Sequence, residues 1–299
     1  ELFEAGLESG AELGAGRNVV VEGRELIDMW SGFADRERTR PWRRDTLANV
    51  YSTTKGITAI AAHQLVERGE LELDAPVARY WPEFAQKGKA SIPVRMLLNH
   101  RAGLAAVTRP LSPEDLFDWA TMTRALEEQE PWWEPGADHG YHALTYGWLV
   151  GELIRRVSGM SVGRYVREHI AAPLGAEFWI GLPEELDART AELHQGPISS
   201  DGPNLMERIA AEPEGVLAKA FGNPPLLLMS PNTRAWRAAE LPAANGHTTA
   251  PALARIYAAL ASGGELDGVR ILRRETIERA REEESYGPDR VLALVSRIG

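Results

Sequence analysis

The sequence has 299 residues, a formal net charge of −10 and no cysteine. This length allows one large core or two closely joined lobes, and 44% hydrophobic with 25% charged residues is ordinary for a globular enzyme. The acidic balance without a basic stripe disfavours nucleic acid and anionic membranes as partners, and the lack of cysteine excludes disulfides and Cys-ligated metals.

The N-terminal third is expected to contain a helix, a hairpin and a second helix. Residues 1–15 suggest a short amphipathic helix. Apolar residues then alternate around a turn at Glu22-Gly23-Arg24, which predicts a β-hairpin from about 18 to 33. From residue 53 to about 68 the apolar spacing becomes helical, and Gly69 marks the end of that helix.

The rest of the chain is predicted to be mainly helical. Short or long helices are expected in "IPVRMLLNHRAGL" (92–104), "TYGWLVGELIRRVSG" (145–159) and "TAPALARIYAALASGG" (249–264), each ended by glycine. Frequent proline and glycine between 195 and 250 predict long ordered loops. The last segment, "YGPDRVLALVSRIG", indicates a turn that enters a strand.

This order of elements indicates two interleaved lobes. Residues 1–51 and about 240–299 are expected to form an α/β lobe, and about 52–239 a mostly helical one. Since no run of 18 apolar residues occurs, nothing is expected to span a membrane. The first residues lack the basic start and apolar core of a signal peptide, so a cytoplasmic location is expected.

Ser52 and Lys55 form a Ser-x-x-Lys pair at the start of the second predicted helix. Residues three apart share a helix face, so the ammonium can approach the hydroxyl. A lysine desolvated in a cleft loses its charge and can take the serine proton, while N–H groups at the helix start suit an oxyanion. The alternative is that Ser52 is an N-cap and Lys55 a solvated first-turn residue.

Tyr141 stands between a Pro-Gly turn and a predicted helix, where it either shares protons with Ser52 and Lys55 or anchors core. Nearby aromatic residues either build core or wall an apolar acyl pocket. The candidate substrate-binding residues are Trp132, Trp133, His142 and Tyr146. His139 and His142 form a bare His-x-x-His, a weak metal motif, so neither a metal nor another cofactor is expected.

In chain order, these segments resemble the serine β-lactamase-like superfamily. The resemblance rests on Ser52-Thr53-Thr54-Lys55 opening a helix, on His-x-x-Gly-Leu within "IPVRMLLNHRAGL", on "PGADHGYHALTYGWLVGELIRRVSG" and on the late helix with its glycine turn. It covers about residues 17–275. Within the superfamily, the chain most resembles the class C-like branch and its bacterial family VIII carboxylesterases.

The resemblance implies an α/β (α+β) fold, in which an antiparallel sheet flanked by helices joins a mostly helical lobe and the active site lies between them. It also implies that Ser52 forms an acyl-enzyme, that Lys55 assists its deprotonation and that Tyr141 is the shared general base and acid. The Ser52 N–H would supply half of the oxyanion hole. The implied reaction is cofactor-free hydrolysis of a small carboxylic ester, and a pocket bordered by Trp132, Trp133 and Tyr146 predicts a short or aromatic acyl group.

Two departures from the family pattern bear on the substrate. Tyr141-His142-Ala143 replaces the Tyr-x-Asn of class C β-lactamases, which removes an amide suited to a β-lactam side chain and favours esters. The family's third motif, Lys-Thr-Gly or a His/Trp-x-Gly variant, is not found. A β-lactamase, a D-amino-acid peptidase or an acyltransferase on the same residues is the alternative, as is a catalytically silent binding protein.

The last predicted strand has an expected consequence for assembly. As an edge strand it would leave N–H and C=O groups unpaired. We therefore expect either a longer natural chain or a partner chain that completes the sheet, and the oligomeric state stays open.

Overall fold

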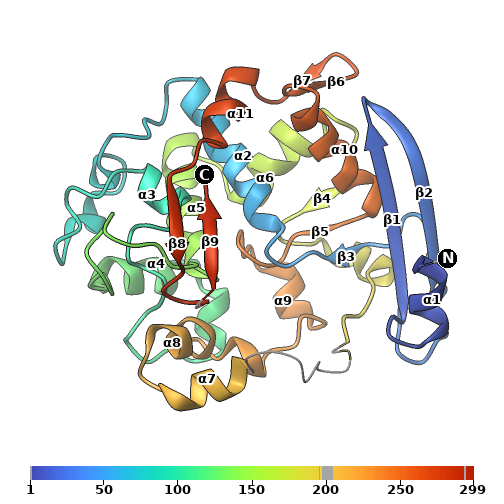
Figure 1. Cartoon of the computed structure of the whole chain (residues 1–299), viewed down its shortest axis with the longest axis horizontal. Helices are drawn as coiled ribbons and strands as arrows, with labels where there is room; N and C mark the ends of the chain where they lie inside the picture. Colours follow the sequence, from blue (N-terminus) through green and yellow to red (C-terminus); the bar gives the residue numbers. More distant parts are fainter. Residues whose placement is uncertain (1, 195, 197–204, 293) are drawn as a thin grey trace.

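The computed structural model of the chain describes residues 2–194, 196, 205–292 and 294–299. The N-terminal hairpin lies at one edge of the molecule, the C-terminal hairpin lies over the mainly helical body, and helix α2 runs between the two hairpins (Figure 1). The helices of the described part are α1 (Leu2–Glu8), α2 (Thr54–Glu67), α3 (Arg95–Leu98), α4 (Trp119–Glu128), α5 (Thr145–Ser158), α6 (Val162–Val166), α7 (Leu205–Ala211), α8 (Val216–Gly222), α9 (Arg234–Ala238), α10 (Ala250–Ala261) and α11 (Arg274–Ala280). The strands are β1 (Gly14–Val21), β2 (Arg24–Gly32), β3 (Ala48–Asn49), β4 (Phe178–Trp179), β5 (His247–Thr248), β6 (Glu265–Leu266), β7 (Val269–Arg270), β8 (Ser285–Pro288) and β9 (Val295–Ile298).

The N-terminal hairpin pairs β1 with β2 in antiparallel register, and helix α10 packs against β1. Its two-residue turn has positive φ at both Glu22 (51°) and Gly23 (76°), the type I′ geometry that matches strand twist. The hairpin begins at residue 14, four residues before the predicted start, and α1 is correspondingly short. A Cβ at Gly14 would lie 2.2 Å from the Phe33 carbonyl oxygen, so glycine permits this earlier pairing.

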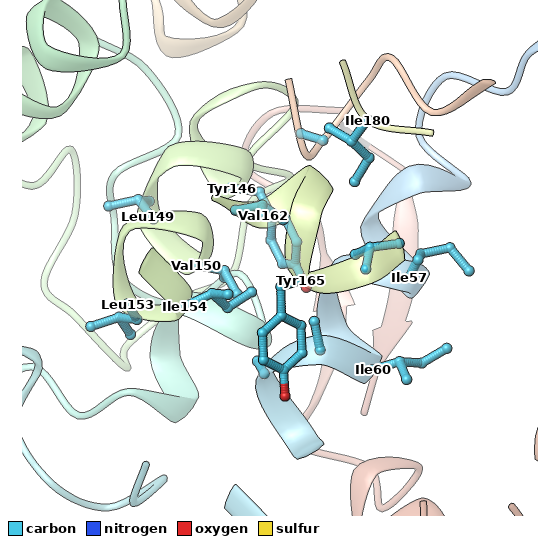
Figure 2. Packing of buried hydrophobic residues seen from close by; sticks show 14 of the residues in the cluster. Ile57, Ile60, Tyr146, Leu149, Val150, Leu153, Ile154, Val162, Tyr165 and Ile180 are labelled. Atoms are coloured by element: carbon cyan, nitrogen blue, oxygen red, sulfur yellow. The ribbon is translucent and has the colours of Figure 1, made fainter. Parts of the chain in front are cut away.

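The core forms where α2 packs against α5 and α6. Ile57 of α2, Ile154 of α5 and Tyr165 of α6 are among its fully buried side chains (Figure 2). Burying an aliphatic side chain of this size contributes about 1.5–3 kcal/mol. The predicted helices at 53–68, 145–159 and 249–264 are confirmed, with ends within three residues.

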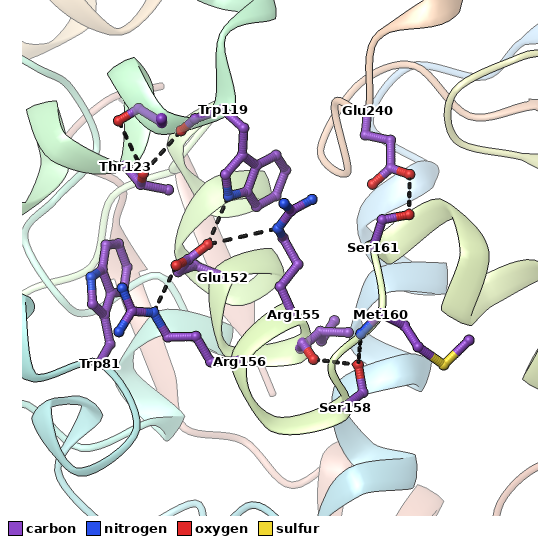
Figure 3. A network of polar contacts seen from close by, with 12 residues as sticks. Trp81, Trp119, Thr123, Glu152, Arg155, Arg156, Ser158, Met160, Ser161 and Glu240 are labelled. Atoms are coloured by element: carbon purple, nitrogen blue, oxygen red, sulfur yellow. Dashed lines mark hydrogen bonds and ion pairs between the residues drawn. The ribbon is translucent and has the colours of Figure 1, made fainter.

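A buried carboxylate joins helices α4 and α5. Glu152 of α5 accepts hydrogen bonds from Trp119 Nε1 and Arg156 Nε, both at 2.7 Å (Figure 3). The neighbouring Ser161 hydroxyl caps α6 through the Arg164 N–H. The helical body is thus fixed by polar as well as apolar contacts.

A small antiparallel sheet, β3–β5–β4, leads the chain into α2. The central strand β5 pairs with β3 on one side and β4 on the other, so residues 48, 178 and 248 lie side by side. Asn49 Nδ2 donates to the carbonyls of Ala244 (2.9 Å) and Gly246 (3.1 Å). These bonds attach the segment before α2 to the segment before α10.

Two sequence predictions are wrong. Between 205 and 238 the structure has helices α7, α8 and α9 where long loops were expected, although residues 197–204 lie outside the described residues. The last strand begins at Val295 rather than near residue 290; it pairs with β8 in a two-stranded sheet, so within the described part of the chain it is still an edge strand. The Asp289 carboxylate accepts from the N–H groups of Val291 and Leu292 and holds 289–292 in a turn.

The mixture of helices and antiparallel strands agrees with the predicted α/β class. The division into two lobes stays a prediction. Over the described ranges, none of the helices combines the length and apolarity needed to cross a bilayer.

Candidate active site

Ser52 is presented by a turn just before α2. Tyr51 adopts φ of 42°, a left-handed conformation that costs a non-glycine residue about 1–3 kcal/mol and persists only when its surroundings hold it. The Val50 N–H donates to the Gly246 carbonyl (2.8 Å), and the Gly246 N–H donates to Thr54 Oγ1 (2.8 Å). The turn is therefore clamped on both sides, and Ser52 itself is exposed.

Lys55 lies in the first turn of α2 and is only 7% exposed. Its Nζ donates to Ser52 Oγ (3.1 Å) and to the carbonyls of Ala143 (2.7 Å) and Ala243 (2.9 Å). Burial lowers the lysine pKa to about 7, because the charged form loses its hydration. A neutral amine next to Ser52 is thus accessible near pH 7.

This geometry excludes the structural alternative for the pair. The N-cap of α2 is Thr53, not Ser52, and it makes no side-chain capping bond. Lys55 is buried rather than solvated. The helix start therefore places an exposed hydroxyl beside a desolvated amine, as nucleophile activation requires.

Tyr141 completes the group. Its Oη donates to Ser52 Oγ at 2.6 Å, and its ring centroid lies 4.7 Å from Lys55 Nζ. Burial has the largest effect on the tyrosine pKa and raises it, the hydrogen bond with Ser52 lowers it, and the charge of Asp289 raises it. The net result is a pKa above the ordinary value for tyrosine. The hydroxyl therefore keeps its proton near neutral pH, and Lys55 is the better proton acceptor of the two.

Asp289 was not a candidate from the sequence. Its Oδ1 accepts from the Tyr141 N–H at 3.1 Å, although the two residues are 148 positions apart. The Arg290 N–H donates to the His139 carbonyl at 3.0 Å, next to the same segment. No local pattern could have revealed this contact, since it depends on where the C-terminal hairpin lies.

The two tryptophan candidates lie in a small apolar cluster beside Tyr141. Trp133 is buried and Trp132 is half-buried, and their indole N–H groups donate to the carbonyls of Asp138 and Ala106. The cluster also includes partly buried residues of α8 that the sequence did not single out: Val216, Leu217 and Phe221. The helical spacing of these residues is the signal for α8, but the frequent proline and glycine around them predict a loop.

His142 does not fit its predicted substrate-binding role. It is fully buried, its Nε2 accepts from the Leu104 N–H (3.0 Å) and its Nδ1 lies 2.6 Å from the Gly140 carbonyl. Burial lowers its pKa to about 4. With both ring nitrogens engaged, His142 supports the loop and offers nothing to a substrate or a metal.

Tyr146 and His139 also serve structural contacts. Tyr146 is 3% exposed, with its ring centroid 6.0 Å from Lys55 Nζ, so it lies behind the lysine rather than along a pocket. His139 Nε2 lies 2.9 Å from Ser296 Oγ. Across the described residues, no group of three or more His, Asp or Glu side chains could hold a metal ion.

Comparisons with known proteins identify the family of this chain. The family profile described as Beta-lactamase matches residues 1–299. The esterase/β-lactamase LipL of Mycobacterium tuberculosis is 37% identical over 306 residues, which cover 97% of this chain and 68% of that protein.

Two crystal structures are similar over almost the whole chain. A penicillin-binding protein homologue from Caulobacter crescentus gives a TM-score of 0.90 at 39% identity and covers 100% of this chain and 78% of its own. A family VIII carboxylesterase gives 0.88 at 40% identity, with coverage of 99% and 77%. The predicted fold class is confirmed, and the chain belongs to the beta-lactamase family.

Proposed function

We propose that this protein is a serine hydrolase that cleaves small carboxylic esters through an acyl-enzyme on Ser52. The observation that carries the proposal is the convergence of Lys55 Nζ and Tyr141 Oη on the exposed Ser52 Oγ, at 3.1 and 2.6 Å. The names of similar proteins, an esterase/β-lactamase and a family VIII carboxylesterase, support esters as the substrate class.

Acylation uses Lys55 as the initial base. Neutral Lys55 takes the proton of Ser52, and Oγ forms a bond to the ester carbonyl carbon. The oxyanion that results is stabilised by the Ser52 N–H at the start of α2. When the bond to the alcohol oxygen breaks, Tyr141 gives its proton to the departing alkoxide and recovers one from the Lys55 ammonium.

Deacylation repeats these transfers with water. A water molecule takes the place of the alcohol, and Tyr141 with Lys55 accepts one of its protons as its oxygen attacks the acyl carbon. The tetrahedral intermediate then expels Ser52 Oγ, which regains a proton. The carboxylic acid leaves and the site returns to its starting state.

The surroundings of the site favour uncharged acyl groups. The apolar cluster beside Tyr141 would leave a buried charge unpaired, which is costly. Ala143, whose carbonyl binds Lys55, has only a methyl group where a class C β-lactamase has an amide. Short or aromatic esters are therefore the proposed substrates.

Ser52→Ala tests the nucleophile. The variant should lose hydrolysis of p-nitrophenyl acetate and butyrate by at least about 10³-fold in kcat, with an unchanged melting temperature. Activity within about tenfold of wild type, about 1.4 kcal/mol in the barrier, would place the nucleophile elsewhere.

A substrate series tests the ester assignment. We expect kcat/KM to be higher for acetate and butyrate esters than for long-chain esters or a chromogenic cephalosporin. If the cephalosporin has the highest kcat/KM, the β-lactamase alternative is correct and the ester assignment is wrong.

The proposal also includes the location of the protein and its partners. The net charge of −10 supports small molecules rather than nucleic acid or a membrane surface as partners, and a cytoplasmic location is part of the proposal. A partner chain stays possible, and light scattering of the purified protein would measure the oligomeric state.

A further inference from the structure

His100 holds both residues that flank Tyr141. Its carbonyl accepts from the Gly140 N–H at 3.1 Å, and its Nδ1 accepts from the His142 N–H, also at 3.1 Å. The segment 140–142 is therefore bonded to one residue at each end, while the Tyr141 N–H binds Asp289.

The backbone conformation of His100 belongs to the end of helix α3, and its ring lies against the Tyr141 segment. Its φ of 61° lies in the left-handed region that commonly follows a helix C-cap, here Asn99, and the Arg101 N–H donates to the Met96 carbonyl at 3.0 Å. The ring lies among three others, with centroid distances of 5.3 Å to Tyr141, 5.4 Å to His142 and 5.2 Å to Tyr146. The carbonyl and the ring of His100 thus both contact the segment that carries Tyr141.

The hydrogen bond requires a particular form of the ring. Nδ1 can accept only when it carries no proton, so the imidazole is neutral with its proton on Nε2. Burial lowers the His100 pKa well below its ordinary value, and the neighbouring His142 and Lys55 lower it further. The acceptor therefore persists at the pH at which Lys55 works.

We propose that His100 is a positioning residue for the ester hydrolysis: its Nδ1 and carbonyl fix the 140–142 segment so that Tyr141 Oη reaches Ser52 Oγ. The inference rests on the proposed function. It concerns the placement of Tyr141 rather than contact with the substrate. Since a displacement of about 1 Å in a catalytic group can cost about 10²-fold in rate, loss of this acceptor should appear mainly in kcat.

Two substitutions separate the acceptor from the ring. His100→Asn keeps an acceptor close to the position of Nδ1 and suits a positive φ, because asparagine tolerates that region. His100→Phe keeps a planar ring but has no acceptor. His169→Phe is the matched control, since His169 also packs its ring on a tyrosine, Tyr165, at 4.5 Å but lies outside the site.

With p-nitrophenyl acetate we expect His100→Phe to lower kcat by about 10- to 100-fold with KM within about threefold. His100→Asn should keep kcat within about threefold of wild type, and His169→Phe should match wild type. Tyr141→Phe and the double variant His100→Phe/Tyr141→Phe should differ by less than about twofold, because His100 acts through the Tyr141 hydroxyl.

Several outcomes would overturn the inference. A folded His100→Phe with wild-type kcat would show that the acceptor is not needed. Equal losses in folded His100→Asn and His100→Phe would assign the effect to the ring, and additive losses in the double variant would place His100 on a separate step. Should His100→Phe not fold, a tenfold loss in folded His100→Asn decides against the acceptor. Absence of ester hydrolysis in the wild type is a different failure, that of the proposed function.

Discussion

Lys55 is the residue whose charge state controls the proposed chemistry. Three acceptors surround its Nζ, two of them backbone carbonyls, and burial brings its pKa to about 7. The pKa of Tyr141 is shifted in the opposite direction, because burial raises it. The environment thus separates a proton acceptor from a proton donor around one hydroxyl, which is how acid and base roles are usually divided at neutral pH.

The first residue-scale prediction is a pH profile. Because the base is neutral Lys55, kcat/KM for an uncharged ester should rise about tenfold per pH unit below pH 7 and level off above it. Initial rates from pH 5 to 9 measure this. A flat profile between pH 5 and 8 would mean that Lys55 does not act as the base.

The free energy of unfolding should also depend on the protonation of Lys55. The folded pKa of Lys55 is lowered from 10.5 to about 7, so between these values the unfolded chain binds more protons than the folded one. Wild-type stability, measured relative to Lys55→Met, should therefore rise with pH through this window, by up to about 1.4 kcal/mol per unit. Below pH 7 the difference between the two proteins should stay constant.

Urea unfolding at pH 6, 8 and 9 measures this difference. Lys219→Met is the control, because Lys219 pairs with the exposed Glu214 at the surface. The control should show no such slope. A Lys55→Met difference that is independent of pH from 7 to 9 would contradict the buried, weakly basic lysine.

At the scale of elements, α5 approaches the active site through a glycine. A Cβ at Gly147 would lie 2.8 Å from the Ala243 nitrogen and 3.1 Å from the Ala243 Cβ. The carbonyl of that same residue accepts from Lys55 Nζ. Helix α5 therefore packs closely against Ala243, whose carbonyl holds the Lys55 ammonium group in place.

Gly147→Ala should accordingly destabilise the protein by about 1–3 kcal/mol, because a tightly packed backbone must shift. It should also lower kcat, since the Ala243 carbonyl moves away from Lys55. Gly222→Ala in α8 is the control: nothing lies within 4 Å of the added Cβ, so stability should rise slightly or stay constant. Equal behaviour of the two variants in urea unfolding would refute the close packing of α5.

The contact between α4 and α5 gives another prediction. Glu152 binds Trp119 and Arg156 in a site where it is 9% exposed (Figure 3). Glu152→Leu removes the acceptor of the Trp119 indole N–H, while Arg156 keeps its ion pair with Glu83, and should cost about 1–3 kcal/mol of stability. Ester hydrolysis by the folded protein should stay within about threefold of wild type, since Glu152 lies outside the site; unchanged unfolding in urea would show that the network contributes little.

Local sequence patterns predicted these elements well where one period was sustained. The apolar spacing of α2, α5 and α10 and the glycine after α5 were sufficient to place all three helices. Patterns failed where a single contact decides the conformation. Gly14 allows the first hairpin to start earlier, because it has no Cβ that would clash with the Phe33 carbonyl. Asp289 accepts from the N–H groups of Val291 and Leu292 and so holds a turn in a segment whose apolar residues alternate as in a strand.

At the scale of the whole molecule, the site is assembled from segments far apart in the sequence. The spacing of Ser52 and Lys55 made them candidates but left the N-cap alternative open, and the roles of all three residues were expected from the resemblance to a family. The 2.6 Å contact between Tyr141 and Ser52 spans 89 positions, and no periodicity encodes it. The same holds for the Ala243 carbonyl on Lys55 and for His100 beneath the Tyr141 segment.

The side chains around this centre were predicted less well for a related reason. Aromatic residues near Tyr141 in the sequence were assigned to a pocket, yet Tyr146 is buried and His142 is enclosed by backbone groups. The apolar neighbours from α8 come from more than 70 positions further along the chain. Closeness to Tyr141 in the sequence did not indicate which of these side chains are buried in the core and which are available to line a pocket.

The central claim is that Ser52 is the nucleophile of an acyl-enzyme, and covalent labelling tests it most directly. The wild-type protein is incubated with a fluorophosphonate probe, and the intact and digested protein is analysed by mass spectrometry beside Ser52→Ala. We predict one adduct per chain, on Ser52, formed in step with loss of esterase activity and absent from the variant. An adduct on another residue, or full esterase activity in protein labelled at Ser52, would contradict the claim.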